Sequence, residues 1–410
     1  MKIPHLFLTS LLFSLLFGCE KADPNFIPQR KDIVLTRAGE EIVDASYCFS
    51  FNLFKEAAKY SGYKNIILSP FSAQIANCML ANGADGDTYD QIVSATGFEG
   101  YSLEDINLAY KTVLKGLYGV DTSTKLSIAN SIWIMRDFPV YNQFIKSVED
   151  NYDGYVKQLD FSSKNALSDV NKWISQKTAG HISDILENLS PDSQVIVANA
   201  LFFKGRWKEK FLPERTRTDF FKKADGAVVS KRFMCTSQDL LYGETEDEKV
   251  RLCEIPYGNE AFVLDIILPV EGVNFKDFID NLSGEEWWDM FTYKSTHKVN
   301  LYLPKFKIES DLNLNSQLAT LGMNLPYEHG NADFSRLSNM PLVIRETRQK
   351  AIIDVDENGT TATVTTHHKG DWNTLPGPGD VIEFKADHPF VFLIRETTSK
   401  TILFIGTLAE

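Results

Sequence analysis

Hydrophobic positions along this 410-residue chain alternate between helical and strand periodicity. Apolar residues at helical spacing predict an amphipathic helix around residues 45–57, with Ala45, Cys48, Phe49, Leu53 and Ala57 on its apolar side. Residues 195–207 contain an almost unbroken apolar run, which is typical of a strand buried on both faces. The same patterns predict strands at 126–134, 261–269 and 299–306, and helices at 169–180 and 312–321.

Short polar signals mark where helices begin and end. Ser69 followed by Pro70 is a favourable helix start, because serine caps the first turn and proline fits it. Residues 88–91 and 283–286 have the spacing of capping boxes and predict two further helix N-termini. Gly322 is expected to end the helix at 312–321.

Residues 352–390 combine strand and loop signals in an unusual order. Ile353 and Val355 alternate with polar neighbours as in a strand, and Asn358-Gly359 indicates a turn. Residues 360–366 are nonetheless β-branched or small and carry no charge, which is strand composition inside a long loop. The pattern indicates a loop whose first half is able to become a strand. A threonine-rich surface loop is the simpler alternative.

Several motifs, taken in order, resemble the serpin family. They are Ser69-Pro-x-Ser72, the pattern Asn-x-x-x-Phe-Lys-Gly-x-Trp from Asn199 to Trp207, Leu303-Pro-Lys-Phe306, Asp356-Glu-Asn-Gly-Thr360, His388-Pro-Phe390 and Phe404-Ile-Gly-Thr-Leu408. The resemblance covers about residues 44–410. It implies an α+β serpin fold with three β-sheets, about nine helices and an exposed reactive-centre loop.

The resemblance also implies a function. Serpins of the inhibitory kind act as suicide substrates, in which a serine or cysteine protease cleaves the loop, becomes trapped as an acyl-enzyme, and is carried away when the loop inserts as a strand. A protein of this kind works as a monomer, is not an enzyme, has no catalytic residues and needs no cofactor. The alternative is a non-inhibitory serpin that acts as a binding or chaperone-like module.

The hinge of the loop decides between these alternatives, because charge, bulk or proline there obstructs insertion. The resemblance assigns the hinge to Glu357, Gly359, Thr360, Thr361, Ala362, Thr363 and Val364. None of the residues from Thr360 to Val364 is charged or proline, which favours the inhibitor. Thr360 is expected to enter the sheet first, with its side chain facing inward.

The position of the reactive bond follows from counting along the loop. The family's usual spacing from Gly359 leads to the bond between Asn373 and Thr374, whereas counting back from residues 388–390 leads towards Pro378. We prefer the first count, because the length of the inserted strand is set from the hinge side. Cleavage after Lys369, Trp372 or Leu375 remains open, so the predicted window is residues 369–375.

Three further parts of the resemblance concern the main sheet. Ser69, Ser72 and Asn199 match the family's shutter, where the sheet opens, and Gln349 stands where a histidine is common. Glutamine donates and accepts hydrogen bonds but does not become charged, so pH-dependent opening is not expected here. Trp207 matches the family's breach.

The N-terminus has the features of an export signal. Lys2 precedes a mainly apolar run at residues 6–17, which is too short for a membrane span, and Leu16-Phe17-Gly18-Cys19 resembles a bacterial lipobox. We therefore expect a signal peptide at 1–18, a lipidated Cys19 with a tether at 19–41, and the serpin domain at 42–410. The expected location is the outer membrane, facing the periplasm or the cell surface, with plain secretion as the alternative.

Composition excludes several other functions. A net charge of −13 argues against nucleic acid as a partner, and the chain has no Gly-x-Ser-x-Gly, His-Glu-x-x-His or Walker motif. His367-His368 is not expected to bind metal, because adjacent side chains on an extended chain point apart. The remaining cysteines lie in apolar stretches, so buried free thiols are favoured over disulfides at Cys48, Cys78, Cys235 and Cys253.

Overall fold

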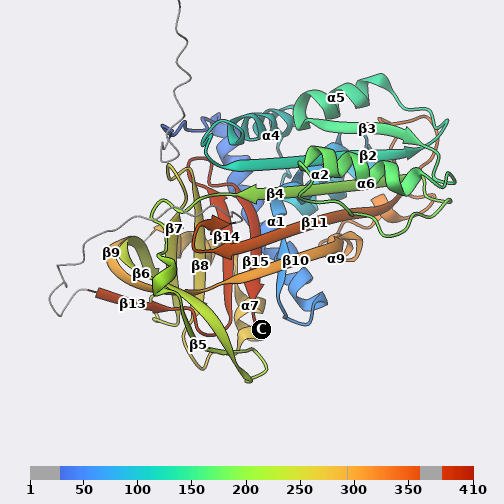
Figure 1. Cartoon of the computed structure of the whole chain (residues 1–410). Helices are drawn as coiled ribbons and strands as arrows, with labels where there is room; N and C mark the ends of the chain where they lie inside the picture. Colours follow the sequence, from blue (N-terminus) through green and yellow to red (C-terminus); the bar gives the residue numbers. More distant parts are fainter. Residues whose placement is uncertain (1–27, 293, 361–380) are drawn as a thin grey trace, which may run out of the picture.

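The structure is a computed structural model of the chain, and it describes residues 28–292, 294–360 and 381–410 (Figure 1). The described residues form nine α-helices: α1 (Arg37–Tyr60), α2 (Pro70–Ala81), α3 (Gly86–Thr96), α4 (Leu103–Leu117), α5 (Asn142–Tyr152), α6 (Ala166–Lys177), α7 (Phe275–Asn281), α8 (Gly284–Thr292) and α9 (Asn315–Thr320).

Strands in the described residues are β1 (Ile66–Leu68), β2 (Lys125–Met135), β3 (Gly154–Leu159), β4 (Val195–Lys204), β5 (Arg217–Lys222), β6 (Val228–Glu244), β7 (Val250–Pro256), β8 (Phe262–Pro269), β9 (Ser295–Pro304), β10 (Phe306–Asn313), β11 (Ile344–Asp356), β12 (Gly359–Thr360), β13 (Val381–Lys385), β14 (Phe390–Glu396) and β15 (Ile402–Leu408). They form a mixed α and β architecture, as the sequence predicts.

Two hydrogen-bonded sheets contain these strands, where three sheets were expected. The six-stranded sheet has the order β10-β11-β4-β2-β3, with β12 added beside β11. The nine-stranded sheet has the order β1-β15-β14-β8-β7-β6-β9-β13, with β5 added beside β6. The long strand β6 explains the lower count, because it pairs with β5, β9 and β7 in turn and so joins strands that would otherwise form separate sheets.

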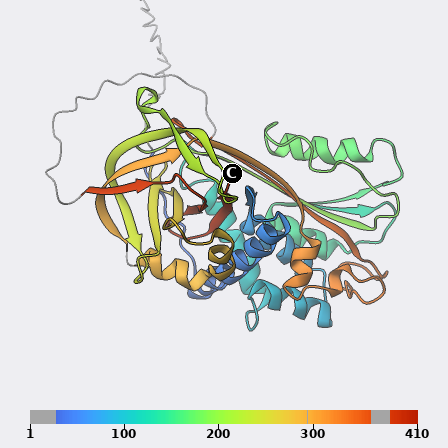
Figure 2. The ribbon, with the colours of Figure 1, turned by 90° about the horizontal axis from the view of Figure 1, so that it is seen from below.

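The six-stranded sheet is covered on both faces (Figure 2). On one face Val170 and Ile174 of α6 belong to the same distinct apolar cluster as Ile196 and Phe202 of β4. On the other face Val197, Leu201 and neighbouring residues join the main core. Alternate residues of β4 therefore serve two separate cores, which confirms the prediction of a strand buried on both faces.

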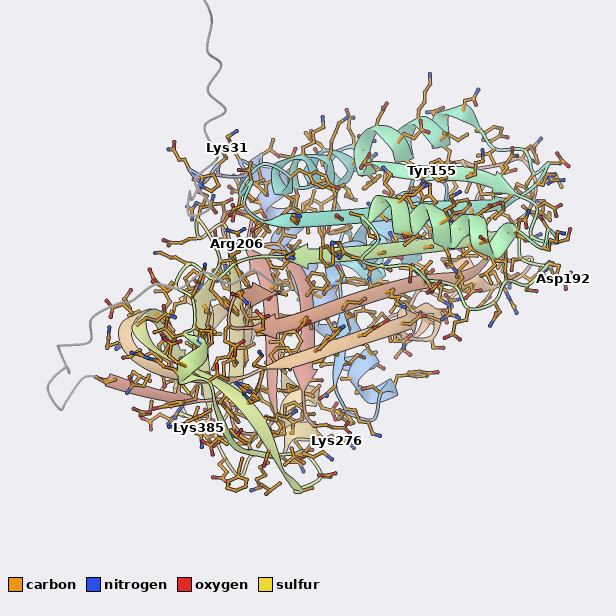
Figure 3. The ribbon with its side chains drawn as sticks, in the orientation of Figure 1. Lys31, Tyr155, Asp192, Arg206, Lys276 and Lys385 are labelled. Carbon is orange, nitrogen blue, oxygen red and sulfur yellow. The ribbon has the colours of Figure 1, made fainter. Side chains whose placement is uncertain are left out.

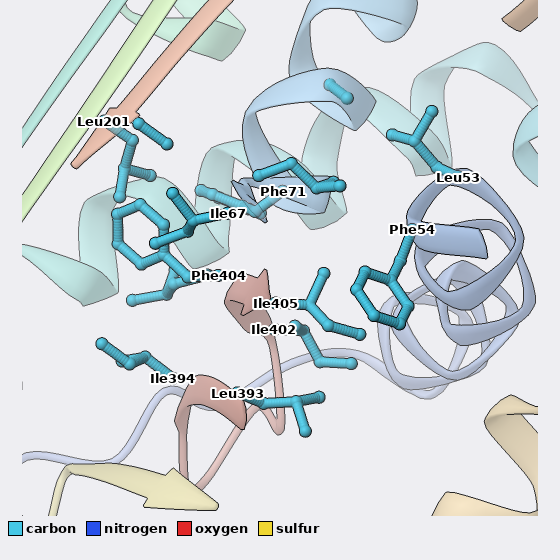
Figure 4. Close-up of a cluster of buried hydrophobic side chains, with 14 of the residues drawn as sticks. Leu53, Phe54, Ile67, Phe71, Leu201, Leu393, Ile394, Ile402, Phe404 and Ile405 are labelled. Carbon is cyan, nitrogen blue, oxygen red and sulfur yellow. The ribbon is translucent and has the colours of Figure 1, made fainter. Parts of the chain in front are cut away.

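The main core lies between α1, α2 and the end of the nine-stranded sheet (Figure 4). Its centre includes Leu53, Phe54, Ile67, Phe71, Leu201, Leu393, Ile394, Ile402, Phe404 and Ile405. Every residue of α2 is buried, so this helix lies entirely inside the molecule, beneath the six-stranded sheet. Burial of this kind fixes α2 relative to the strands above it, and Ser69 at its N-terminus is fixed with it.

Several local predictions need correction. Helix α1 begins at Arg37, with Thr36 as its cap, so residues 37–41 are helical and the expected tether boundary at 41 lies inside α1. The predicted strand 299–306 is divided at Lys305 between β9 and β10. Leu312 belongs to β10, and α9 starts only at Asn315. In each case pairing with neighbouring strands, or packing, set the boundary instead of the local pattern.

The capping box predicted at residues 88–91 is also wrong. Asp85 caps α3, and its side chain accepts a hydrogen bond from the Gly86 N–H. Thr88 instead accepts from the Asp333 N–H, and Gln91 accepts from the N–H groups at residues 324 and 325. These polar side chains bind a loop that is remote in sequence, which a local motif does not reveal.

The four described cysteines are free thiols, but they are not all buried. Cys78 and Cys253 are buried, Cys235 is half-buried and Cys48 is exposed. The prediction of burial is therefore wrong for Cys48. The buried stripe of α1 runs through Val43, Tyr47 and Phe54, and Cys48 lies beside it on the solvent side.

Candidate functional site

The candidate site is the space between β4 and β11, where the loop begins. The two strands run parallel and pair directly from Ile344 with Val195 to Ala351 with Leu201. Beyond this level β11 has a different partner, because Val355 pairs with Thr360 and Asp356 with Gly359 of β12. Gly359 also forms a bridge with Arg206, just after β4. The start of the loop therefore already lies between the two strands at this end.

Close backbone approach at this point requires glycine. Gly359 has φ +141°, and a Cβ atom there would lie 2.0 Å from the carbonyl oxygen of Gly205. The Thr360 N–H donates to the same carbonyl at 2.9 Å. A larger residue at position 359 would push the loop out of the sheet, so the Asn358-Gly359 pair does more than form a turn.

Thr360 is held inward by an aromatic group. Its side chain is 1% exposed, and its hydroxyl oxygen lies 2.6 Å from the Tyr257 hydroxyl oxygen. Tyr257 stacks on Trp207 with ring centroids 4.5 Å apart, and Phe203 packs edge-on against it at 5.2 Å. Thr360 is therefore buried in this structure, and a buried hydroxyl pair satisfies its polar atom.

Trp207 fixes the backbone on both sides of the turn. Its indole N–H donates to the Asp356 carbonyl at 2.8 Å, and its backbone N–H donates to the Asn358 carbonyl at 3.2 Å. Because the ring also stacks on Tyr257, one side chain links the end of β11, the turn and the threonine pocket. This arrangement gives the predicted breach residue a specific structural role.

Glu357 connects the hinge to the neighbouring strands by charge. Its carboxylate accepts from Lys305 Nζ at 2.5 Å and from the Thr216 hydroxyl at 2.8 Å. Burial by itself would raise the pKa of this carboxyl, but the hydrogen bonds from Lys305 and Thr216 help to outweigh it and lower the pKa. Glu357 is therefore a charged anchor at neutral pH.

Two of the expected shutter residues, Asn199 and Gln349, lie earlier on β4 and β11, and the other two, Ser69 and Ser72, lie at the start of α2. Gln349 of β11 accepts from the Ser69 N–H and donates to the Ser69 carbonyl, both at 2.8 Å, and both residues are buried. Gln349 thus closes a two-bond contact between the sheet and the start of α2. It occupies both of the backbone groups that Ser69 offers it.

Asn199 and Ser72 are close in the fold but are not bonded to Gln349. Asn199 pairs with Gln349 in strand register, yet its amide donates to Asn130 at 2.9 Å, and Asn130 donates to the Tyr152 carbonyl at 3.0 Å. The Ser72 N–H donates to the Ser69 hydroxyl. Within the described residues, the Ser72 hydroxyl and the side-chain amide oxygen of Asn199, Oδ1, make no hydrogen bond. The four residues form one buried polar layer, connected only in part.

Comparison with known proteins identifies the family. The family model "Serpin (serine protease inhibitor)" matches residues 44–410. This chain belongs to the serpin family.

Relatives of this serpin come from distant organisms. An uncharacterised serpin-like protein of Thermococcus kodakarensis is 31% identical, with 93% of this chain and 89% of the relative covered. The leukocyte elastase inhibitor of Homo sapiens is 30% identical, with 90% and 100% covered. Among solved structures, the thermophilic serpin tengpin in its native state is similar with a TM-score of 0.85, 30% identity, and 93% and 97% covered. The predicted serpin fold is confirmed.

Part of the predicted site lies outside the described residues of this serpin. That part comprises the later hinge residues Thr361, Ala362, Thr363 and Val364, the reactive-bond candidates Lys369, Trp372, Asn373, Thr374 and Leu375, and the lipidation candidate Cys19. The described site therefore consists of the predicted hinge residues at 357–360 and the predicted breach and shutter residues.

Sequence reasoning missed three residues that the serpin uses at this site. Tyr257 holds Thr360, Lys305 binds Glu357 and Asn130 binds Asn199. Lys305 lies inside the Leu303-Pro-Lys-Phe306 motif, which is a signal that was available. Tyr257 has only its place before Gly258 to distinguish it, because its partner is 103 residues away.

Two features are absent from the part of the chain that the structure describes. No three side chains among His, Cys, Asp and Glu gather there as a potential metal site. Of the helices in the same residues, none has both the length and the apolar character needed to cross a bilayer.

Proposed function

We propose that this serpin inhibits serine or cysteine proteases as a suicide substrate. The observation that carries the proposal is the hinge: Gly359 and Thr360 are already paired with β11, and the next six residues, 361–366, carry no charge. A loop that begins inside the sheet and continues with strand-forming residues is suited to insertion between β4 and β11.

The chemistry belongs to the protease, and this chain supplies the bond that is cut. The protease nucleophile attacks a carbonyl in the window 369–375, with Asn373 leading, forms an ester or thioester, and releases the new amino terminus that follows. The β4–β11 pairs then separate and each strand pairs with the inserted loop. Insertion from residue 357 to 373 would move the attached protease roughly 50 Å, at about 3.3 Å per residue.

Energy for this movement comes from the sheet itself. Insertion replaces one parallel contact between β4 and β11 by two new contacts with the loop, and it buries Val364. Burial of that side chain alone contributes about 1.5–3 kcal/mol. Deacylation fails because the displaced protease loses its active geometry, so the chain acts as a single-use substrate and a monomer, without a cofactor.

The test uses the serpin without residues 1–19 and a panel of serine and cysteine proteases. We expect a complex that survives boiling in detergent with at least one protease, and mass spectrometry should place the cut in residues 369–375. Thr360→Arg is the matched control and should be cut without complex formation. Cleavage of the wild-type chain by every protease without a stable complex would favour the non-inhibitory binding or chaperone-like alternative.

We further propose that Cys19 is lipidated and anchors the serpin at the cell envelope, on the outer membrane. The support is the lipobox-like sequence that ends at Cys19. Cell fractionation of full-length wild type and Cys19→Ala should move the variant out of the membrane fraction. If both stay in the membrane equally, the anchor lies elsewhere, and if both appear in the medium, the serpin is secreted.

A further inference from the structure

The segment immediately before α1 is built into the domain. We call residues 30–33 the strap. Ile33 is only 7% exposed and packs on α4 at Gly116, where an added Cβ atom would lie 2.6 Å from Ile33 Cγ1. The Ile33 N–H donates to the Thr398 hydroxyl at 2.9 Å. The strap is therefore held by side-chain packing on α4 and by a hydrogen bond to the β14–β15 turn.

One route leads from the strap to the turn between β7 and β8, residues 257–261. The Val120 carbonyl accepts hydrogen bonds from the Lys31 N–H at 3.4 Å and from Asn259 Nδ2 at 2.8 Å. The other amide atom of Asn259, Oδ1, accepts from the Ala261 N–H at 3.0 Å and so closes the turn on itself. One carbonyl thus joins the strap and the turn.

A second route passes through the β14–β15 turn. The Thr397 N–H donates to the Ala261 carbonyl and its hydroxyl donates to the Glu260 carbonyl, both at 2.9 Å. Its neighbour Thr398 receives the strap, and the buried carboxylate of Glu396 accepts from both the N–H and the hydroxyl of Thr398. These bonds make the β14–β15 turn a firm link between the strap and residues 260–261.

The opposite side of the β7–β8 turn holds the hinge. The Gly258 N–H donates to the Arg206 carbonyl at 2.8 Å, and Arg206 bridges Gly359. Tyr257 bonds Thr360 directly. Gly258 has φ +39°, and a Cβ there would lie 2.4 Å from Asp121 Oδ2, so a larger residue does not fit at this position of the turn. Lys31 and Arg206 lie at the same end of the molecule (Figure 3).

We propose that the strap positions the hinge, with the β7–β8 turn as the connecting element and Asn259, Thr397 and Tyr257 as positioning residues. Two independent sets of hydrogen bonds converge on a five-residue turn from one side, and the hinge rests on its other side. A displaced strap leaves the turn free to move, which weakens the Tyr257–Thr360 contact and lets the hinge leave the sheet more often. The effect on inhibition rests on the proposed function, whereas the coupling itself does not.

Gly116→Ala is the sharpest test. Alanine favours the α4 helix over glycine, so a purely local effect would stabilise the protein. The added methyl instead collides with Ile33 and displaces the strap. Gly119→Ala is the matched control, because a Cβ there would meet its nearest atom, the Gly116 carbonyl oxygen, at an ordinary 3.6 Å.

Hydrogen–deuterium exchange of the free serpin is the measurement, so no protease is needed. Peptides covering 205–211 and 355–360 contain the hinge hydrogen bonds and should exchange about tenfold faster in Gly116→Ala. Peptides from β3 should keep wild-type rates, and Gly119→Ala should match wild type everywhere. Faster exchange confined to the strap, with wild-type rates at 355–360, would overturn the proposal.

Two variants separate the routes. Asn259→Asp keeps the acceptor for Ala261 but loses the donor to Val120. Thr397→Val loses the hydroxyl bonds to the Glu260 and Ala261 carbonyls and the bond that the hydroxyl accepts from Arg30 of the strap, and it keeps the backbone bond to Ala261. Each should raise hinge exchange by about threefold, and the double variant should approach Gly116→Ala. Ile33→Ala replaces Gly116→Ala if that variant does not fold. Loss of protease complexes with unchanged hinge exchange would count against the coupling, and normal coupling without any complex would count only against inhibition.

Discussion

The same two strands, β4 and β11, behave differently at two levels. At residues 344–351 of β11 they pair directly, and Gln349 ties the sheet to Ser69 beneath it. At residues 355–356 they are apart, and Gly359 and Thr360 fill the space between them. The upper level is already open and filled by the loop. The lower level is closed, and among its polar side chains Gln349 is bonded to Ser69, whereas the Ser72 hydroxyl and Asn199 Oδ1 make no hydrogen bond within the described residues. At the upper level the Tyr257–Thr360 hydroxyl pair holds the loop, and at the lower level the Gln349–Ser69 hydrogen bonds hold β11 to α2.

If the loop inserts as proposed, the two levels differ in the contacts that insertion must break. At the upper level, the Gly205 carbonyl already accepts from the Thr360 N–H and the Tyr257 and Thr360 hydroxyls are already bonded to each other, so the proposed insertion would break no further bond there. At the lower level, each inserted residue of the loop would have to replace a β4–β11 backbone pair. When the loop reaches Gln349, the strands would separate at the residue that is bonded to Ser69. Under the proposed function, insertion would therefore start at the predicted hinge and meet its barrier at the predicted shutter.

Thr360→Arg should break the upper level and have the largest effect. An arginine has no partner in the pocket formed by Tyr257, Trp207 and Phe203, and burial of an unpaired charge is strongly unfavourable. We expect stable protease complexes to fall by about tenfold or more, with ordinary cleavage in their place. Gel analysis of the complex measures this.

Thr360→Ser is the control for the upper level, because it keeps the hydroxyl that contacts Tyr257. It should retain most of the complex. An arginine variant with undiminished complex would show that Thr360 does not enter the sheet during inhibition.

Gln349→Ala should break the lower level. It removes two buried hydrogen bonds and leaves the Ser69 N–H and carbonyl without this partner, which should lower the free energy of unfolding by roughly 2–4 kcal/mol. Urea unfolding followed by tryptophan fluorescence measures the change. Arg345→Ala is the control, since this exposed residue lies on the same strand. Equal free energies of unfolding for the two variants would show that the Gln349–Ser69 hydrogen bonds do not stabilise the protein.

Glu357→Gln tests how much the charge of Glu357 stabilises the upper level. Since the folded-state pKa of Glu357 is lowered, its contribution to stability is present above the usual carboxyl pKa and is lost as pH falls through the folded value. We expect a loss of about 1–2 kcal/mol at pH 7, where Lys305 loses its charged partner. As pH falls below the usual carboxyl pKa and through the lower folded-state pKa, the difference in stability between variant and wild type should disappear.

Unfolding measured from pH 7 to pH 3 tests the role of Glu357. Lys305→Met should reduce the dependence of the free energy of unfolding on pH to a similar extent. The double variant should be little less stable than either single variant. A constant difference between Glu357→Gln and wild type across this range would show that the charge of Glu357 is not responsible.

His181→Gln should have the smallest effect and tests the outer face of β4. The imidazole stacks on Phe202, with ring centroids 3.7 Å apart. Burial, followed by the charges of Lys204 and Lys125, lowers the pKa of His181. Stability is therefore full above about pH 6.5 and declines as pH falls below it, since the unfolded chain binds the proton more readily.

The substitution should remove this decline, which we expect to be a few tenths of a kcal/mol because the ring is exposed. Thermal unfolding at pH 7.5 and pH 5.5 measures it. A larger acid loss in the variant than in wild type would mean that protonated His181 stabilises the cover of β4.

Local pattern determined much of the fold before any coordinates. The apolar run at 195–207 required a strand buried on both faces, and β4 has residues in two separate cores. Motif order identified the family, and the uncharged residues after Gly359 indicated the hinge. These features are local, since periodicity, glycine and capping residues act within a few positions.

Tertiary structure alone decided the partners. Tyr257 and Thr360 are 103 residues apart, and Gln349 and Ser69 are 280 apart, so no spacing rule joins them. Packing also overruled the local capping box at 88–91 and placed Cys48 in solvent. The sequence alone indicated the family and the type of many elements, because backbone conformation follows nearby residues, and it predicts the hinge. Which hydroxyl, amide or aromatic ring holds the hinge depends on chain segments that only the folded core brings together.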